Sequence, residues 1–184
     1  MSSVLTESRV KKIFQYDLDT YHKLGTIGIL PRNTELIHGI VVRKITISPK
    51  HRKVVNKLRD ILSSAIPERF IVLQESPIKI ADSEPEPDIS LLEGNYDDFG
   101  DKYPETAAFV VEVTFSSLED DLYKADIYAS ANISIYWILD LQNQKILVFE
   151  NPINGKYTFQ KAVGLEEKIL IPLTNKLISL AEII

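Results

Sequence analysis

The sequence contains no cysteine, which excludes a disulfide framework and any zinc site built on thiolates. It also lacks an apolar run near the roughly 18 residues that a membrane-spanning helix requires, so no membrane partner is expected. Residues 1–9 do not show the basic segment and apolar run that mark a signal peptide. Together these absences predict a protein of a reducing compartment, the cytoplasm.

Basic residues are in the minority, because 21 Lys and Arg against 26 Asp and Glu give a net charge of −5. Proteins that hold nucleic acid by general electrostatic attraction are usually basic. A nuclease is still compatible with this charge, since a carboxylate-rich site is negative until it binds a metal. The basic residues that do occur crowd into one region, where they form either a solvated helix face or a surface that contacts phosphates. They are Arg43, Lys44, Lys50, Arg52, Lys53, Lys57 and Arg59.

The 184 residues contain no repeat, low-complexity tract or linker, which predicts one domain over residues 1–184. The N-terminal part predicts a helix over residues 16–25 that ends at Gly25, then a hairpin over 35–48 that turns at His38-Gly39. A second helix is predicted from Pro49 to Pro67, because apolar residues recur there at spacings of three and four.

The rest of the chain predicts three strands, a helix and further strands. The three strand-like runs cover residues 70–80, 87–92 and 107–115, with a polar loop at 93–106. A helix follows over 119–131, with Ser116 or Ser117 as its cap. Strands at 134–140, 145–150 and 156–161 form a meander. The helix over 119–131 is expected to bury Leu118, Leu122, Ala125 and Ala129.

Two carboxylates are predicted to face each other on the second and third of these strands. If the two strands pair antiparallel around a connection centred on Gly100, residues equally far from Gly100 lie opposite each other. Asp88 then lies opposite Glu112, because their residue numbers add to twice 100. Glu112 also interrupts an apolar run, where a charge is costly unless it is paired or bound to metal. Two oxygen-donor carboxylates suit Mg²⁺. The alternative is a glutamate at a sheet edge or in a structural ion pair.

Lys124 lies one to two turns into the helix that follows Glu112, so its side chain could reach back toward the strand end. By periodicity alone it is an ordinary solvated lysine, paired with Asp120 or Asp121.

The chain resembles the Uma-two-type restriction endonucleases, a family of the PD-(D/E)XK nuclease superfamily. The resemblance is carried, in order, by six segments with compatible spacing. They are Thr34-Glu35-Leu36-Ile37-His38-Gly39, Ser48-Pro49-Lys50-His51, Glu86-Pro87-Asp88-Ile89, Val111-Glu112-Val113-Thr114-Phe115-Ser116, the segment from Asp121 to Ala129 with its Asp121, Lys124 and Tyr128, and Ile135-Tyr136-Trp137-Ile138-Leu139-Asp140.

The resemblance implies an α/β (α+β) fold with a restriction-endonuclease-like core. The core order is helix-strand-strand-strand-helix-strand with a mixed central sheet, flanked by an N-terminal hairpin and a C-terminal β-meander. The implied function is a divalent-metal-dependent endodeoxyribonuclease that hydrolyses DNA phosphodiester bonds with Mg²⁺ or Mn²⁺ and without a nucleotide cofactor. A homodimer is expected, since cutting both strands of a duplex is easiest with two sites related by a twofold axis. The alternative is an inactive nuclease-fold module for DNA binding or homodimeric interaction.

The resemblance also implies roles for individual residues. Asp88 and Glu112 would bind the metal together with the main-chain carbonyl of Val113, and Lys124 would supply the positive charge. The superfamily's usual lysine position is occupied by Thr114, so the lysine is placed on the next helix instead. Weaker candidates for support of the site are Glu35, His51 and Gln74; His51 is otherwise a buried, hydrogen-bonded histidine. Tyr128 and Trp137 are expected to be core aromatics. The candidate nucleic-acid contacts are Lys50, Arg52, Lys53 and Lys57.

Overall fold

The computed structural model describes residues 13–44 and 48–184 of the chain. The predictions for residues 1–9, and the last part of the predicted hairpin at residues 45–47, lie outside the described residues. The chain divides into two compact units: residues up to Lys44 with Ala81–Pro85, and Ile45–Ile80 with Glu86–Ile184. The single domain expected from the sequence stays a prediction, and each unit is considered by itself.

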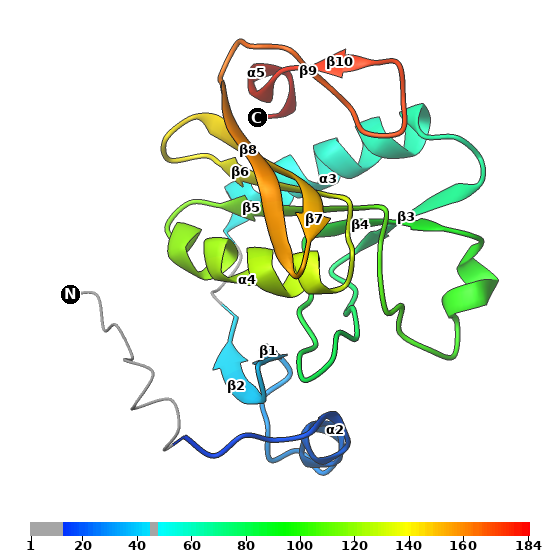
Figure 1. The fold of residues 1–184 in the computed structure, drawn as a ribbon, viewed down its shortest axis with the longest axis vertical. Coiled ribbons are helices and arrows are strands. Elements are labelled where there is room, and N and C mark those ends of the chain that lie inside the picture. Colours follow the sequence, from blue (N-terminus) through cyan, green and yellow to red (C-terminus); the bar gives the residue numbers. More distant parts are fainter. Residues whose placement is uncertain (1–12, 45–47) are drawn as a thin grey trace. The chain divides into compact units, whose positions relative to one another are not determined.

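The N-terminal unit holds a helix and a two-stranded hairpin (Figure 1). Helix α2 (Leu18–Thr26) begins where the Asp17 side chain accepts a hydrogen bond from the Thr20 amide, at 2.7 Å. Strands β1 (Thr34–Ile37) and β2 (Ile40–Arg43) pair antiparallel, as predicted. His38 and Gly39 both have positive φ, of 49° and 72°, which is the backbone that the tight hairpin turn requires.

The larger unit is built around a six-stranded mixed sheet in the order β3-β4-β5-β6-β7-β8. Only the β5–β6 pair is parallel, and the other neighbours are antiparallel. The strands are β3 (Phe70–Gln74), β4 (Ile89–Glu93), β5 (Phe109–Thr114), β6 (Ile135–Asp140), β7 (Lys145–Ile153) and β8 (Lys156–Gly164). This architecture confirms the predicted fold class.

Helices α3 (Pro49–Ala65) and α4 (Leu118–Ser130) lie against the sheet (Figure 1). The α3 side chains Val54, Leu58 and Leu62 are buried in one cluster with the odd-numbered residues of the central strands, such as Leu91, Val111 and Trp137. The even-numbered residues Glu112 and Tyr136 instead hydrogen-bond to α4. Since successive strand residues point to opposite faces, the two helices cover opposite faces of the sheet.

The β4–β5 pairing has the register that the sequence predicts. Ile89 lies opposite Val111 and Leu91 opposite Phe109, so paired numbers add to 200. This register places Asp88, just before β4, beside Glu112 on β5.

Several boundaries differ from the prediction. The run over residues 70–80 is a strand only as far as Gln74, because Glu75 takes a positive φ of 48° and Pro77 follows. A short 3₁₀ helix, Tyr96–Phe99, lies within the predicted loop over 93–106. No element was predicted for the C-terminal segments, which are strands β9 (Ile169–Leu170) and β10 (Leu177–Ile178) and helix α5 (Leu180–Ile183).

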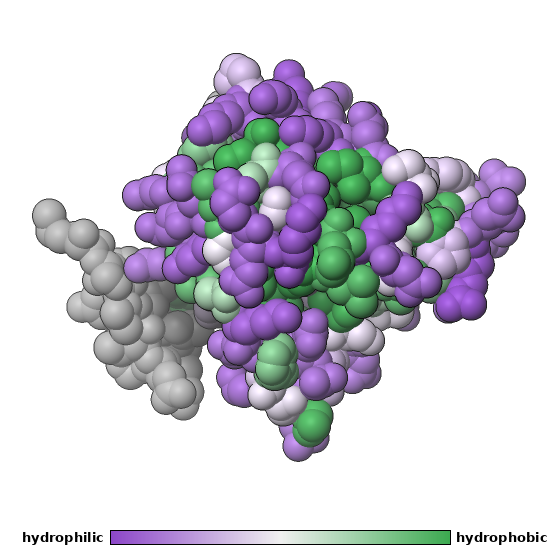
Figure 2. Space-filling view, turned by 90° about the horizontal axis from the view of Figure 1, so that it is seen from above, coloured by the Kyte–Doolittle hydropathy of each residue, from purple (hydrophilic) through white to green (hydrophobic). Residues whose placement is uncertain are grey.

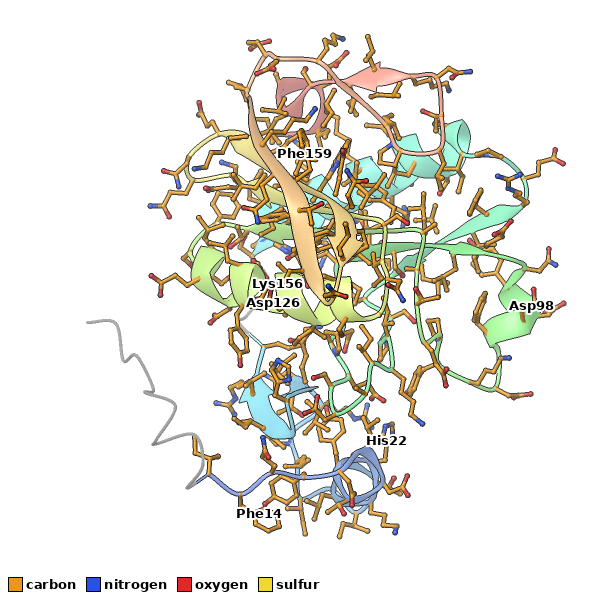
Figure 3. The ribbon with its side chains drawn as sticks, viewed as in Figure 1. Phe14, His22, Asp98, Asp126, Lys156 and Phe159 are labelled. Atoms are coloured by element: carbon orange, nitrogen blue, oxygen red, sulfur yellow. The ribbon has the colours of Figure 1, made fainter. Side chains whose placement is uncertain are left out.

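The surface of the larger unit carries isolated ion pairs and scattered apolar residues. Lys156 on β8 and Asp126 on α4 form an exposed pair at 2.8 Å, which links the edge strand to the helix (Figure 3). Apolar side chains interrupt the hydrophilic surface at the end that carries α5, β9 and β10 (Figure 2), and Leu170 is 52% exposed there. None of the described helices has the length and apolar character needed to cross a membrane.

The core on the α3 side of the sheet gives a stability prediction. Leu91 is completely buried, so Leu91→Ala should lower the free energy of unfolding by about 2–5 kcal/mol through lost burial and a cavity. Leu170→Ala removes the same atoms from an exposed side chain, and we expect a change within about 0.5 kcal/mol. Urea denaturation measures both, and equal losses would show that the packing described for Leu91 is wrong.

Candidate active site

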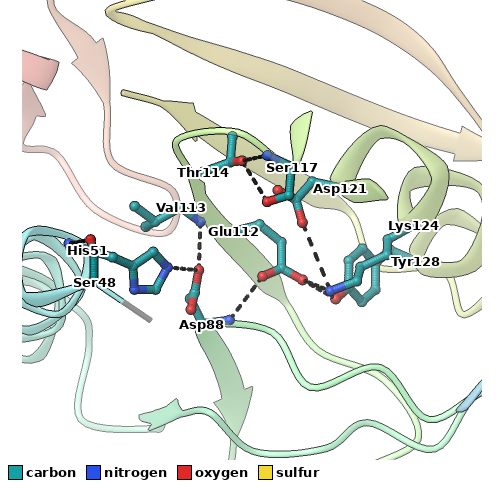
Figure 4. A network of polar contacts seen from close by, with 10 residues as sticks. All are labelled: Ser48, His51, Asp88, Glu112, Val113, Thr114, Ser117, Asp121, Lys124 and Tyr128. Atoms are coloured by element: carbon teal, nitrogen blue, oxygen red, sulfur yellow. Dashed lines mark hydrogen bonds and ion pairs between the residues drawn. The ribbon is translucent and has the colours of Figure 1, made fainter. Parts of the chain in front are cut away.

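Asp88 lies at the point where the chain enters β4, and its carboxylate bridges that strand to β5 and α3 (Figure 4). Its Oδ2 accepts a hydrogen bond from the main-chain amide of Val113 at 2.7 Å and lies 3.1 Å from Nε2 of His51. The Asp88 side chain is 13% exposed. Its orientation is therefore set by a strand on one side and a helix on the other.

Glu112 is a charged residue in the middle of a fully buried strand, with only 4% of its surface exposed. Its Oε1 accepts hydrogen bonds from Nζ of Lys124 and from the hydroxyl of Tyr128, both at 2.9 Å. Its Oε2 accepts from the main-chain amide of Asp88 at 3.2 Å. Such a burial is costly unless the charge is paired and hydrogen-bonded, and here it is both.

Lys124 points inward from α4 and is not the solvated lysine that periodicity alone favours. Its side chain is 12% exposed and forms an ion pair with Glu112, while the carboxylate of Asp121 lies 4.0 Å away at the i,i+3 position. The structure therefore brings Lys124 to Glu112, whose other carboxylate oxygen accepts from the main-chain amide of Asp88.

Asp121 is a further buried carboxylate of this network that we did not predict as a site residue. Burial and then the neighbouring charge of Glu112 raise its pKa to about 8, against the opposing effect of Lys124. Asp121, Lys124 and Tyr128 follow one another at spacings of three and four, so they lie on one face of α4. That spacing, and their place in a single family motif, is the signal that could have identified all three together.

The buried face of α4 differs from the predicted one. Leu122 is 40% exposed rather than buried, and Leu118 and Ala125 are only partly buried, whereas Ala129 is buried as expected. The reason is that polar residues take the inward face because they have partners on β5. Tyr128 is buried as predicted, but its hydroxyl also belongs to the network.

His51 lies in the first turn of α3 and faces the site, with its side chain 14% exposed. Burial by itself lowers the pKa of His51. The hydrogen bond and charge of Asp88, helped by the Val113 main chain and the charge of Glu112, outweigh it and hold the pKa above its ordinary value. The ring is thus suited to donate from Nε2 to Asp88.

Thr114, at the position where the family resemblance leads one to expect the superfamily's lysine, makes a structural contact. Its hydroxyl oxygen accepts a hydrogen bond from the Ser117 amide at 3.1 Å and lies 2.9 Å from the Ser117 hydroxyl. Ser117 is the N-cap of α4 by position, as predicted, but its own side chain makes no capping hydrogen bond. Thr114 therefore supplies a hydrogen bond at the start of the helix that carries Lys124.

The other predicted residues lie outside this network or stay predictions. Gln74 accepts a hydrogen bond from Arg59 of α3 at 3.2 Å. Glu35 is buried on β1 in the N-terminal unit, and its role at the site stays a prediction. Lys50, Arg52, Lys53 and Lys57 are exposed on α3, and Lys57 also donates to the main-chain oxygen of Ile184 at 3.2 Å.

The raised pKa of Asp121 predicts a pH dependence of stability. Because the native carboxyl binds its proton more tightly than the unfolded one, the stability it contributes is present below about pH 4 and is lost as the pH rises through about 8. In metal-free buffer, the parent should therefore lose stability relative to Asp121→Asn between about pH 5 and about pH 8. Urea denaturation at both pH values tests this, and parallel profiles for the two proteins would contradict it.

Comparison with known proteins places the chain in a family. The model of the Uma2 family, described as "Putative restriction endonuclease", matches residues 19–181. No curated protein matches the chain. Among solved structures it is similar to "a putative nuclease belonging to DUF820 from Anabaena variabilis ATCC 29413", with a TM-score of 0.66 and 15% identity, over 87% of this chain and 96% of that one. That likeness concerns the fold alone, but the family model spans most of the sequence, and the chain therefore belongs to the Uma2 family.

Proposed function

We propose that this protein is a divalent-metal-dependent endodeoxyribonuclease whose catalytic residues are Asp88, Glu112 and Lys124. One observation supports the proposal most: two carboxylates on neighbouring strands share a hydrogen-bond network with a buried lysine ammonium group 2.9 Å from Glu112. The family description, "Putative restriction endonuclease", supports DNA as the substrate.

The proposed metal ligands are the carboxylates of Asp88 and Glu112 and the main-chain carbonyl of Val113. All three are oxygen donors, the type that Mg²⁺ and Mn²⁺ prefer. Among residues 13–44 and 48–184 there is no group of three or more His, Cys, Asp and Glu side chains placed to hold a metal. Two carboxylates nevertheless fit Mg²⁺, which usually keeps several waters and takes further oxygens from phosphates.

In the proposed reaction, the bond from a water oxygen to phosphorus forms as the bond to the leaving sugar oxygen breaks. Asp88 and Glu112 would hold the metal, which when bound would polarise a phosphate oxygen of the DNA and lower the pKa of a nearby water. Lys124, held at Glu112, orients the water or stabilises the charge that grows on the phosphate. His51 donates to Asp88 and so keeps that carboxylate turned toward Glu112.

We propose that DNA approaches the site from the side of α3. His51 lies next to Asp88, and the basic residues Lys50, Arg52 and Lys53 are exposed in the same turn of α3. The first turn of α4 instead exposes the carboxylates of Glu119 and Asp120, which repel phosphates. The basic turn of α3 thus offers local attraction to a protein whose net charge is −5. A homodimer that cuts both strands is part of the same proposal.

The activity test is nicking of plasmid DNA by the purified protein in Mg²⁺ or Mn²⁺. Lys124→Ala should reduce the rate by ~10²-fold or more, because it removes a preorganised positive charge from the site. Asp88→Ala and Glu112→Ala should abolish both the nicking and the heat of metal binding measured by calorimetry.

The same measurements separate the alternatives. Equal nicking by the parent and Lys124→Ala would mean that a contaminant cuts the plasmid and would refute the assignment. A parent that binds DNA but shows neither metal heat nor nicking would be a binding module on a nuclease fold.

The proposed DNA path predicts a difference between two exposed lysines. Lys53→Ala should weaken binding to DNA of any sequence and reduce the slope of log affinity against log salt by about 1, because one phosphate contact is lost. Lys161→Ala, which removes the same charge from β8, should leave the slope unchanged. Fluorescence anisotropy at several salt concentrations in Ca²⁺ measures both, and equal slopes for the two variants would contradict the proposed path.

A further inference from the structure

Tyr128 is a completely buried tyrosine whose hydroxyl ends at the catalytic network (Figure 4). It lies one turn after Lys124 on α4, and both residues donate to the same oxygen, Oε1 of Glu112, at 2.9 Å. The ring packs against Tyr136 of β6, with centroids 4.9 Å apart, so the surrounding core fixes where the hydroxyl lies.

Two donors on one oxygen determine how Glu112 is turned. With Oε1 held toward α4, the other oxygen, Oε2, is directed to Asp88, whose amide donates to it at 3.2 Å. Without the phenol, Oε1 would be held by Lys124 alone and could follow the long, flexible lysine side chain. The Tyr128 phenol is rigid, so it restricts the orientation of the Glu112 carboxylate in a way that the flexible lysine cannot.

We propose that Tyr128 is a positioning residue of the metal site. It holds Oε1 of Glu112 on the α4 side and thereby presents Oε2, beside Asp88, to the divalent cation. This inference rests on the proposed function, since it concerns the metal that the same two carboxylates hold. Partners that orient metal-binding groups in this way have a measurable effect on metal affinity.

A merely structural tyrosine would behave differently, and the chain offers a matched control. Tyr157 is also buried, at 7% exposure, and its hydroxyl donates to the main-chain oxygen of Ile133 at 2.8 Å, without contact to either carboxylate. Tyr128→Phe and Tyr157→Phe each remove one hydroxyl and one buried hydrogen bond. Both should lower the melting temperature, and only Tyr128→Phe should affect metal binding.

The experiment is titration calorimetry of Mn²⁺ into the parent and both variants, with melting temperatures measured in chelator. We expect Tyr128→Phe to weaken Mn²⁺ binding about 10- to 100-fold and Tyr157→Phe to leave it unchanged. The Mn²⁺ concentration for half-maximal plasmid nicking should shift by the same factor. Equal affinity in the parent and Tyr128→Phe overturns the inference and leaves the proposed function standing. A parent without Mn²⁺ heat overturns both.

A second measurement covers the case in which Tyr128→Phe does not fold. Fluorotyrosine incorporated at position 128, and in a second sample at position 157, reports on each phenol by fluorine NMR. Mn²⁺ would broaden signals through space at both positions, so Mg²⁺ is the ion to use. The signal from position 128 should shift on Mg²⁺ binding while that from 157 stays in place, and an unmoved signal at 128 overturns the inference.

Discussion

The burial of Glu112 is the constraint on which the rest of the site depends. A carboxylate within a strand whose residues are all buried is unfavourable unless every lone pair that faces the protein has a donor. Here three donors come from two segments: Lys124 and Tyr128 of α4, and the main-chain amide of Asp88. Loss of one donor leaves a buried charge only partly compensated. Removing one partner of such a pair is therefore usually more destabilising than replacing the whole pair by apolar residues. The same contacts therefore stabilise the fold and hold together the residues of the proposed site.

This constraint also explains why α4 turns polar residues toward the sheet. Beyond Lys124 and Tyr128, the main-chain oxygen of Asp121 accepts a hydrogen bond from the buried Tyr136 at 2.9 Å, and Thr114 holds the start of the helix through Ser117. Helix and sheet are thus joined by directional contacts as well as by apolar packing. Directional contacts fix the rotation of the helix about its axis, and that rotation decides where the Lys124 ammonium group lies.

The sequence predicted some of these features well because elementary geometry determines them. Alternation along strands, with a connection centred on Gly100, was enough to place Asp88 beside Glu112 in the observed register. The face of α4 was mispredicted at Leu122, because hydrophobic periodicity assumes that a buried face is apolar. The partners that make a polar face favourable lie on β5 and β6, and no local window of sequence contains them. The end of β3 at Glu75 likewise depends on a backbone conformation that residue type does not specify. The family resemblance, not the local pattern, brought Lys124 into the predicted site.

The family resemblance places the lysine of the proposed site on α4 rather than on β5, and this changes what the proposed site depends on. A lysine at position 114 would point to the same face of β5 as Glu112, since the two positions differ by two, and its place would be fixed by the strand itself. Thr114 instead holds the first turn of α4, and the charge arrives from a helix that is docked separately. The distance between the lysine and Glu112 therefore depends on helix–sheet packing, so core substitutions under α4 should affect the charge at the site as well as stability. In a protein with a strand lysine those two effects would be separable; here the geometry couples them through one helix.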